Sequence, residues 1–400
     1  MTTTKRARWG LVTTTGVLTG FGHGFAAFAV SALLKPLAVD LETGRGAVST
    51  AIGLGRLVAG LASPTIGRIT DARGPRGMVM VGMVVAALGL FGLAFVRTEI
   101  ELYLAWSLVF SLGVAAGFTI ALDKLVVASM TEKRGMGLAV RFSISAVVAT
   151  LIVPIVTAMI EHVGWRQTCT IWGGIILLLL PIPYFFFGAR HLQQSPRQTP
   201  AATKINTPAR NSVLRQPAFW IIAAALTAQA SVTAGLSIHL VALMTDFGLD
   251  PVFAATLFGG MILLTVPVRL LAGYTSDRVT ASKLPLVLGA LLILEGIAVS
   301  SFALAPSFTT MLIVTAALGI AAGAPMVLVL VLCAELFGQD SFGAVQGKLM
   351  MIQVPGTMLA PIIAGYAHDL TGSYVIVIAG FSVVLVAGGA MLWLLRPGKG

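Results

Sequence analysis

Charged residues are scarce in this sequence. Only 10% of its 400 residues are Asp, Glu, Lys or Arg, whereas ordinary soluble proteins carry about 25%. Apolar runs of about eighteen residues or more follow one another along the chain, and each is long enough to cross about 30 Å of hydrocarbon. The scarcity of charge and the length of these runs exclude a set of soluble domains and predict an all-α, polytopic membrane protein.

Cysteine is almost absent, and the patterns that hold cofactors are missing. Cys169 and Cys333 both lie in apolar runs, which predicts neither a disulfide framework nor a metal site. The sequence has no phosphate-binding loop, no metal-spaced His/Cys cluster and no plausible hydrolytic triad. We therefore expect no cofactor, no metal, no ATP coupling within this chain and no enzymatic activity.

The hydrophobic pattern predicts twelve membrane spans. Their approximate ranges are 10–34, 47–68, 77–97, 102–129, 136–160, 167–189, 217–243, 252–273, 284–305, 308–334, 342–366 and 374–395. The first run is too long for a signal-peptide core and lacks a clear small-residue cleavage site, so we expect it to remain as the first span. Six tryptophans lie mostly near span ends and are expected to anchor at the membrane interface: Trp9, Trp106, Trp165, Trp172, Trp220 and Trp393.

The segment 190–216 is a predicted linker. It is rich in Pro, Thr, Gln and Arg and contains no acid. It divides the chain into a six-span bundle at 1–189 and a second at 217–400. Most of the 26 lysines and arginines lie on the side that holds this linker and both termini. On the other side we count only Lys35, Arg45, Arg97 and Arg166.

This charge distribution has two consequences. The net charge of +11 does not indicate a nucleic-acid partner, because the basic residues lie between apolar runs rather than in a patch. By the positive-inside rule, both termini are predicted to be cytoplasmic. The short loops suggest a bacterial inner membrane, with the lipid bilayer as the protein's surroundings.

The two halves also repeat each other. GRITDARG at 67–74 matches GYTSDR at 273–278, and VDLETG at 39–44 aligns with TDFGLD at 245–250, both at an offset of 206. Each half has an even number of spans, so the repeat is parallel. This predicts two six-helix bundles that pack around a central cavity and rock against each other.

The motif after the second span carries a family resemblance. The pattern Gly67-x-x-x-Asp71-x-Arg73-Gly74-x-Arg76 resembles the signature of the major facilitator superfamily, and Gly273-x-x-x-Asp277-Arg278 resembles its weaker second copy. Ala72 and Pro75 stand where basic residues are usual. With twelve spans and a basic central linker, the resemblance covers essentially the whole chain and implies a secondary transporter, for which we expect a monomer.

Three further features resemble the monocarboxylate porter and oxalate/formate antiporter group. They are Arg269 four residues before Gly273, FGAVQG at 342–347, and AGYAHDLTGSY at 364–374. The chain also departs from that group. Thr265 stands where proton-coupled members carry an acid, and Ala32 stands where a first-span lysine is expected. Gln353 aligns with the lysine of the oxalate type. The resemblance implies an anionic substrate and leaves the coupling open.

Two arginines within spans are candidate substrate-binding residues. A charged side chain in hydrocarbon costs at least about 2.5–3.5 kcal/mol on insertion scales. Arg269 lies about 6 Å inside its span at 1.5 Å per residue, so it either extends to the cytoplasmic surface or presents a planar fork to a carboxylate. Arg56 lies about 16 Å inside, too deep to reach the surface, and faces either the substrate path or a structural hydrogen bond.

Two other titratable residues lie at mid-membrane depth. His23, in GFGHGF, is a candidate for substrate contact or proton transfer, and equally a structural group. Glu295, midway along span nine, is the only comparable acid at the depth of Arg56 and a second candidate for proton coupling. Arg56, His23, Arg269 and Gln353 form the predicted substrate-binding set.

Charged residues near the cytoplasmic ends of the spans form a predicted gate. Its members are Asp71, Arg73, Arg76, Asp123, Arg141, Asp277, Arg278 and Lys348. Asp123 either pairs with Arg141 or joins the cluster of Asp71 and its neighbours, and a gate makes and breaks such contacts as the halves rock. Arg141 and Lys348 are the alternative substrate contacts in this set. Lys124 is expected to extend toward the surface.

These observations favour one function over another. Five basic residues within the spans (Arg56, Lys124, Arg141, Arg269 and Lys348) outnumber the two clear acids, which favours a small organic anion as substrate. We expect a secondary transporter of mono- or short dicarboxylates, working by alternating access as a proton symporter or an anion exchanger. The alternative is an efflux transporter for drugs or amphipathic metabolites, in which Glu295 binds a cation.

Overall fold

The computed structural model describes residues 5–130, 134–187, 213–276, 281–304, 307–337 and 342–395. Within these ranges every regular element is helical, and no strand occurs. Twelve helical segments of this described part are long and apolar enough, by length and composition, to cross a membrane. The structure therefore confirms the all-α architecture with twelve candidate spans.

The chain divides into two compact units. The first comprises Met1–Thr199 and Leu240–Gly259, and the second comprises Pro200–His239 and Gly260–Gly400. Residues 240–259, which the sequence places in the second bundle, thus group with the first unit. Most of the predicted linker lies outside the described residues, so the boundary at 190–216 stays a prediction.

The spans of the first unit are not all uniform α-helices. The first span joins α1 (Lys5–Gly24), the π-helix η1 (Phe25–Ala29) and α2 (Val30–Asp40). The fourth span joins α5 (Glu99–Leu102), η2 (Tyr103–Phe110), α6 (Ser111–Val114), η3 (Ala115–Ile120) and α7 (Ala121–Ser129), of which η2 and η3 are π-helical. The others are α3 (Arg45–Arg73), α4 (Pro75–Leu93), α8 (Arg134–Val163) and the pair α9 (Trp165–Leu178) and α10 (Pro181–Phe186).

Local sequence explains where several of these helices begin and end. Gly74 has φ 85° and Gly164 has φ 82°, and both lie between consecutive spans. Glycine adopts this left-handed conformation without steric cost, so each ends one helix and permits the next to begin. Thr98 and Glu101 form a capping box at the start of α5, which satisfies two otherwise unpaired backbone N–H groups.

Small residues bring the third and fourth spans of the first unit very close together. A Cβ atom added to Gly113 of α6 would lie 2.2 Å from the backbone nitrogen of Ala86 in α4, and one added to Gly82 of α4 would lie 2.2 Å from that of Gly117. Such contacts between small residues let membrane helices pack backbone against backbone. α4 also packs on α9, and α1 packs along α8.

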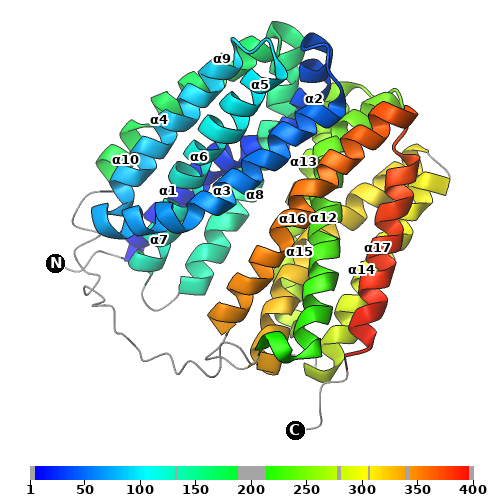
Figure 1. Ribbon diagram of the computed structural model, residues 1–400. Helices are drawn as coiled ribbons and strands as arrows, with labels where there is room; N and C mark the ends of the chain where they lie inside the picture. The colour runs from blue at the N-terminus through cyan, green and yellow to red at the C-terminus, as the bar shows by residue number, and fades with distance from the viewer. Residues whose placement is uncertain are drawn as a thin grey trace. The chain divides into compact units, whose positions relative to one another are not determined.

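Six further spans continue the chain. They are α12 (Pro217–Asp246), α13 (Pro251–Ser276), α14 (Leu284–Leu304), α15 (Phe308–Phe337), α16 (Phe342–Thr371) and α17 (Val375–Trp393), with the short 3₁₀ segments η5 (Val213–Arg215) and η6 (Ala281–Lys283). α14 lies alongside α17 (Figure 1). There a Cβ on Gly289 would lie 2.6 Å from the carbonyl oxygen of Gly389.

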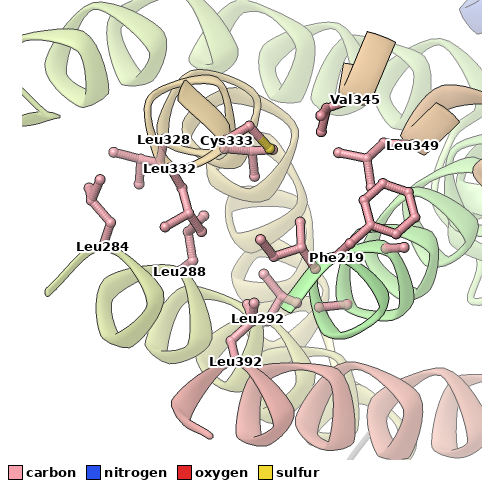
Figure 2. Packing of buried hydrophobic residues seen from close by; sticks show 14 of the residues in the cluster. Phe219, Leu284, Leu288, Leu292, Leu328, Leu332, Cys333, Val345, Leu349 and Leu392 are labelled. Atoms are coloured by element: carbon pink, nitrogen blue, oxygen red, sulfur yellow. The ribbon is translucent and has the colours of Figure 1, made fainter. Parts of the chain in front are cut away.

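One apolar core cluster of the second unit joins the beginnings of α12, α14 and α16 to the ends of α15 and α17. Figure 2 shows Phe219 of α12 with leucines of α14 and α15, Val345 and Leu349 of α16, and Leu392 of α17. Cys333 is part of this apolar cluster, and Cys169 is also buried.

Three of the six tryptophans are core residues rather than interfacial anchors. Trp106, Trp165 and Trp172 are buried, whereas the side chains of Trp220 and Trp393 are about half exposed. The expectation was therefore wrong for these three, because proximity to a span end does not determine which face of the helix carries a residue.

Candidate functional site

The first unit contains a cavity of about 200 Å³. Residues of its first, second and fourth spans line this cavity. It brings together two members of the predicted substrate-binding set, Arg56 and His23.

One face of α3 forms a wall of the cavity. Its lining residues are Ile52, Gly55, Arg56, Ala59, Gly60 and Ser63. They recur at spacings of three and four, which places them on one side of an α-helix. From Ile52 to Ser63 this stripe extends about 16 Å along the helix axis. Arg56, the only cation among the described lining residues, is half-buried within it.

The first span places His23 on the cavity between two glycines. A Cβ on Gly22 would lie 2.1 Å from the ring of Phe118, and a Cβ on Gly24 would lie 3.1 Å from the Cβ atom of Ala149. The glycines therefore let α1 approach η3 on one side and α8 on the other. His23 itself is exposed to the cavity, beside Ala26 and Ala27 of η1.

The fourth span contributes an aromatic ring and two hydroxyl groups. Trp106 of η2, Ser111 of α6 and Thr119 of η3 all line the cavity. The Ser111 hydroxyl donates to the Trp106 carbonyl at 2.9 Å, and the Thr119 hydroxyl donates to the Ala115 carbonyl at 2.8 Å. Each π-helical segment of the first unit thus supplies lining residues, and π-helical turns occur frequently at functional sites.

A chain of aromatic rings packs against Trp106, which lines the cavity. Trp106 packs on Phe110 at 4.8 Å between ring centroids, and Phe110 contacts Phe25 at 6.0 Å. Phe25 stacks on Trp172 at 5.3 Å, and Trp172 stacks on Phe21 at 5.7 Å. The indole N–H of Trp172 also donates to the Phe21 carbonyl at 3.2 Å. The position of the Trp106 ring is therefore fixed by its packing against neighbouring rings.

The electrostatics of the cavity favour an anion. No acidic side chain occurs among its described lining residues, whereas Arg56 supplies a permanent positive charge. A guanidinium group presents paired N–H donors that match the two oxygens of a carboxylate. Ser63, Ser111, Thr119 and His23 add polar side-chain atoms to a surface whose other lining residues are apolar, Arg56 apart.

Arg141 lies outside this cavity in a buried network. It is completely buried and forms an ion pair with Asp123. Its Nη2 also donates to Thr19 Oγ1 at 2.7 Å and to the Phe118 carbonyl at 3.1 Å. Of the two arrangements that the sequence allowed for Asp123, the structure has the pair with Arg141. The gating role of both residues stays a prediction.

The remaining gate residues of the first unit are separate from that network. Asp71 pairs with Lys124, and both side chains are exposed, which agrees with the expectation that Lys124 extends toward the surface. Arg76 lies over the ring of Tyr184 at 4.7 Å, and Arg73 is exposed.

The other predicted residues fall in the second half of the chain. Arg269, Gln353 and Lys348 are half-buried, and the buried Nε of Arg269 has no hydrogen-bond partner among the described residues. Glu295 is 2% exposed, and neither of its carboxylate oxygens has a hydrogen-bond partner in the described part of the chain. Asp277 and Arg278 lie outside the described residues.

Two ion-pair clusters were missed by the sequence reasoning. Asp246 accepts from Lys35 at 2.6 Å and from both terminal nitrogens of Arg45 at 2.6 and 3.0 Å. Asp40 pairs with Arg166. The repeat carried the signal for these clusters, because the alignment of VDLETG with TDFGLD places Asp40 and Asp246 at equivalent positions.

A buried histidine of the second unit was also missed. His239 Nε2 lies 2.9 Å from the Pro361 carbonyl, and its Nδ1 lies 2.9 Å from the Tyr374 hydroxyl. A carbonyl only accepts hydrogen bonds, so Nε2 carries a proton, and a neutral ring then accepts from Tyr374 at Nδ1. His239 thus ties α12 to α16 and to the start of α17. A lone histidine in an apolar run gave no signal of this.

Comparison with known proteins agrees with the fold. The sequence profile described as the Major Facilitator Superfamily matches residues 16–298 and 243–400. Together with twelve candidate spans, this match defines the class as a multi-pass membrane transporter. The chain belongs to the major facilitator superfamily.

Individual relatives are more distant. Monocarboxylate transporter 13 of Rattus norvegicus is 26% identical over 382 residues, covering 94% of this chain and 84% of the relative. The nitrite extrusion protein of Bacillus subtilis is 23% identical over 371 residues, covering 91% and 89%. A crystal structure of a bacterial homolog of the human lysosomal transporter Spinster has a TM-score of 0.77 at 15% identity and covers 98% of this chain and 97% of that one. The last similarity shows the fold alone.

Proposed function

We propose that this protein is a secondary transporter of small organic anions, namely mono- or short dicarboxylates. The observation that carries the proposal is Arg56, a permanent cation on the wall of a cavity without acidic residues among its described lining. The relatives named as monocarboxylate transporters support this substrate class. The relative named as a nitrite extrusion protein makes inorganic anions the comparison to include.

The anion contributes to transport by binding to the Arg56 guanidinium. Arg56 is most stable when a negative charge lies beside it in the low dielectric of the protein interior. Binding of a carboxylate then stabilises the state in which the bundles close, and an empty carrier crosses less readily. The mechanism is alternating access, either as anion exchange or as proton symport through His23 or Glu295. Arg269 and Gln353 are the substrate contacts proposed for the second bundle.

The surroundings of the protein follow from the same proposal. We place the chain in a bacterial inner membrane as a monomer with both termini in the cytoplasm, as the positive-inside rule predicts. Charged residues at the cytoplasmic span ends form the gate in this arrangement. These are Asp71, Arg73, Arg76, Asp123, Arg141, Asp277, Arg278 and Lys348.

Transport into vesicles tests the anion proposal directly. Purified protein in liposomes should take up labelled lactate, formate or oxalate, and Arg56→Lys should lower the initial rate by about tenfold or more, because lysine lacks the planar fork. Arg269→Lys should also lower it. Arg97→Lys, at the turn between two spans, is the matched control and should behave like the parent. Nitrite and nitrate serve as competitors.

Two outcomes would contradict the proposal. One is the absence of transport of every organic acid in the panel. The other is an Arg56→Lys variant and an Arg269→Lys variant that both retain the parent rate. Competition by nitrite alone would assign the site to inorganic anions instead.

A second function is favoured by one observation. Glu295 is a buried acid without a hydrogen-bond partner among the described residues, which is the group that an exporter of cationic drugs would use. Growth of cells that overproduce the chain, measured against a panel of cationic and acidic compounds, separates the two functions. Resistance to cationic drugs that is lost in Glu295→Gln would support efflux.

A further inference from the structure

The first-unit cavity is larger than a compact acid such as formate or oxalate requires. Its volume is about 200 Å³, and an apolar protein cavity of about 150 Å³ is known to bind benzene. We propose that the substrate carries its carboxylate on an aryl or branched apolar body, and that Gly60 sets the upper limit on the size of that body. This inference rests on the anion-carrier function proposed above and specifies its substrate.

The lining chemistry separates a charged part from an apolar part. Arg56 supplies the only cation among the described lining residues, so the first unit matches a single carboxylate. The lining also includes Ala26, Ala27, Ala59 and Gly60, which carry no polar side-chain atom. Such a surface gains free energy from burying carbon, whereas it leaves a second carboxylate without a partner.

Trp106 is the aromatic member of the described lining. Its ring is held by Phe110, which itself packs on Phe25, so it does not have to be ordered when a ligand binds. Aromatic rings favour stacked or edge-to-face contacts with other rings. An aryl carboxylate therefore fits both the charge and the shape of this cavity.

Gly60 is the position at which the cavity is open. A Cβ atom added to Gly60 would have no other heavy atom within 4 Å, although Gly60 belongs to the lining. A Cβ on its neighbour Gly55 would instead lie 2.3 Å from the Ser111 hydroxyl oxygen. A Cβ atom at position 60 is thus accommodated at the lining of the cavity without displacing protein atoms. Gly60→Leu would fill the space that an aryl body needs.

Gly174 provides a matched control. It is also an exposed glycine within a helix, α9, and a Cβ added there would likewise have no neighbour within 4 Å. It does not belong to the described lining of the cavity. Gly174→Leu therefore repeats the chemical change of Gly60→Leu away from the cavity.

The test is a thermal-shift titration of the purified full chain in detergent, because a ligand of the folded state raises the melting temperature. The probes are formate, lactate, oxalate, benzoate and phenylacetate. In the parent, the two aryl acids should act at concentrations about tenfold or more below those of formate and oxalate. In Gly60→Leu, the aryl acids should lose about tenfold in affinity or more, whereas lactate should change by less than about threefold.

The remaining variants make the result decisive. Gly174→Leu should match the parent, and Gly60→Ala should give an intermediate loss, which keeps the test available if the leucine variant fails to fold. Formate and oxalate binding as tightly as the aryl acids would overturn the inference. So would aryl-acid affinities unchanged in both the Gly60→Leu and Gly60→Ala variants. Failure of the anion-carrier function is distinguishable, because then no acid of either size would stabilise the parent.

Discussion

At the residue scale, Arg141 shows how this protein keeps a charge inside a membrane helix. Its guanidinium is completely buried and is held by Asp123, by the Thr19 hydroxyl and by the Phe118 carbonyl. These partners come from α7, α1 and η3, whereas Arg141 belongs to α8. A single side chain therefore joins three spans, and each partner compensates part of the cost of burying its charge.

Removing one member of this pair should destabilise the protein strongly. Arg141→Met leaves Asp123 without its cation, and Asp123→Asn leaves the buried guanidinium without its anion. Breaking a buried ion pair costs about 3–5 kcal/mol, and we expect the lower end because Asp123 is partly exposed. The free energy of unfolding in detergent, measured by chemical denaturation, checks this prediction.

The Asp71–Lys124 pair is the matched control for that measurement. Both of its side chains are substantially exposed, and exposed ion pairs contribute about 1 kcal/mol or less. Lys124→Met should therefore change stability far less than Arg141→Met. Equal effects of the two substitutions would show that burial does not determine the contribution of Arg141.

At the scale of the helix, the lengths of the hydrophobic runs predicted where the spans lie, but they did not predict where the side chains lie. The predicted span 77–97 corresponds to α4 at Pro75–Leu93, and span 217–243 corresponds to α12 at Pro217–Asp246. The depth of Arg56 followed from counting residues to Gly67. The π-helical segments η2 and η3 could not be predicted, because their i to i+5 hydrogen bonds depend on packing against neighbouring spans rather than on a local motif.

The sequence also predicted individual candidate residues, but it did not predict which of them lie together in one site. Arg56 and His23 were selected for their depth, and the structure places both on one cavity. Trp106 was missed as a lining residue, because its place on the cavity follows from the packing of the first unit and not from its position near a span end. Which face of a helix lines a cavity depends on the helices packed around it, and a single sequence does not show how the helices pack.

The close contact between α4 and α6 gives a prediction at this scale. A methyl group added by Gly113→Ala would lie 2.2 Å from the backbone nitrogen of Ala86, and backbone atoms yield only if the helices separate. Overpacking costs about 1–3 kcal/mol, and we expect the upper part of this range. Gly77→Ala is the control, because an added Cβ there has no neighbour within 4 Å. The melting temperatures of the two variants in detergent decide the matter, and a Gly113→Ala variant as stable as Gly77→Ala would contradict the prediction.

At the scale of the whole molecule, the division into two units gives Asp246 its importance. Residues 240–259 group with the first unit, although the preceding residues of α12 group with the second. Within the first unit, Asp246 binds Lys35 and Arg45, and the Lys35 ammonium also donates to the Thr245 hydroxyl at 2.6 Å. These contacts hold residues 240–259 against the first and second spans within the first unit.

Neutralising Asp246 should loosen this segment in a measurable way. Ser31 is 2% exposed and lines, with Lys35 and Thr245, a second cavity of about 150 Å³ in the first unit. A Ser31→Cys reporter should react slowly with a water-soluble maleimide in the parent background, where Cys169 and Cys333 are buried. Asp246→Asn should raise that rate by about three- to fivefold, the factor that corresponds to about 1 kcal/mol for a partly exposed ion pair.

The repeat supplies the control for this experiment. Asp40 is the equivalent residue of the first half. It pairs with Arg166, and both residues belong to the first unit. Asp40→Asn removes a similar ion pair without touching residues 240–259, so the reporter should react as it does in the parent. High salt should mimic Asp246→Asn in the parent, because exposed ion pairs are screened. A reporter that reacts at the parent rate in Asp246→Asn, or equally fast in Asp40→Asn, would mean that the Asp246 cluster does not hold this segment.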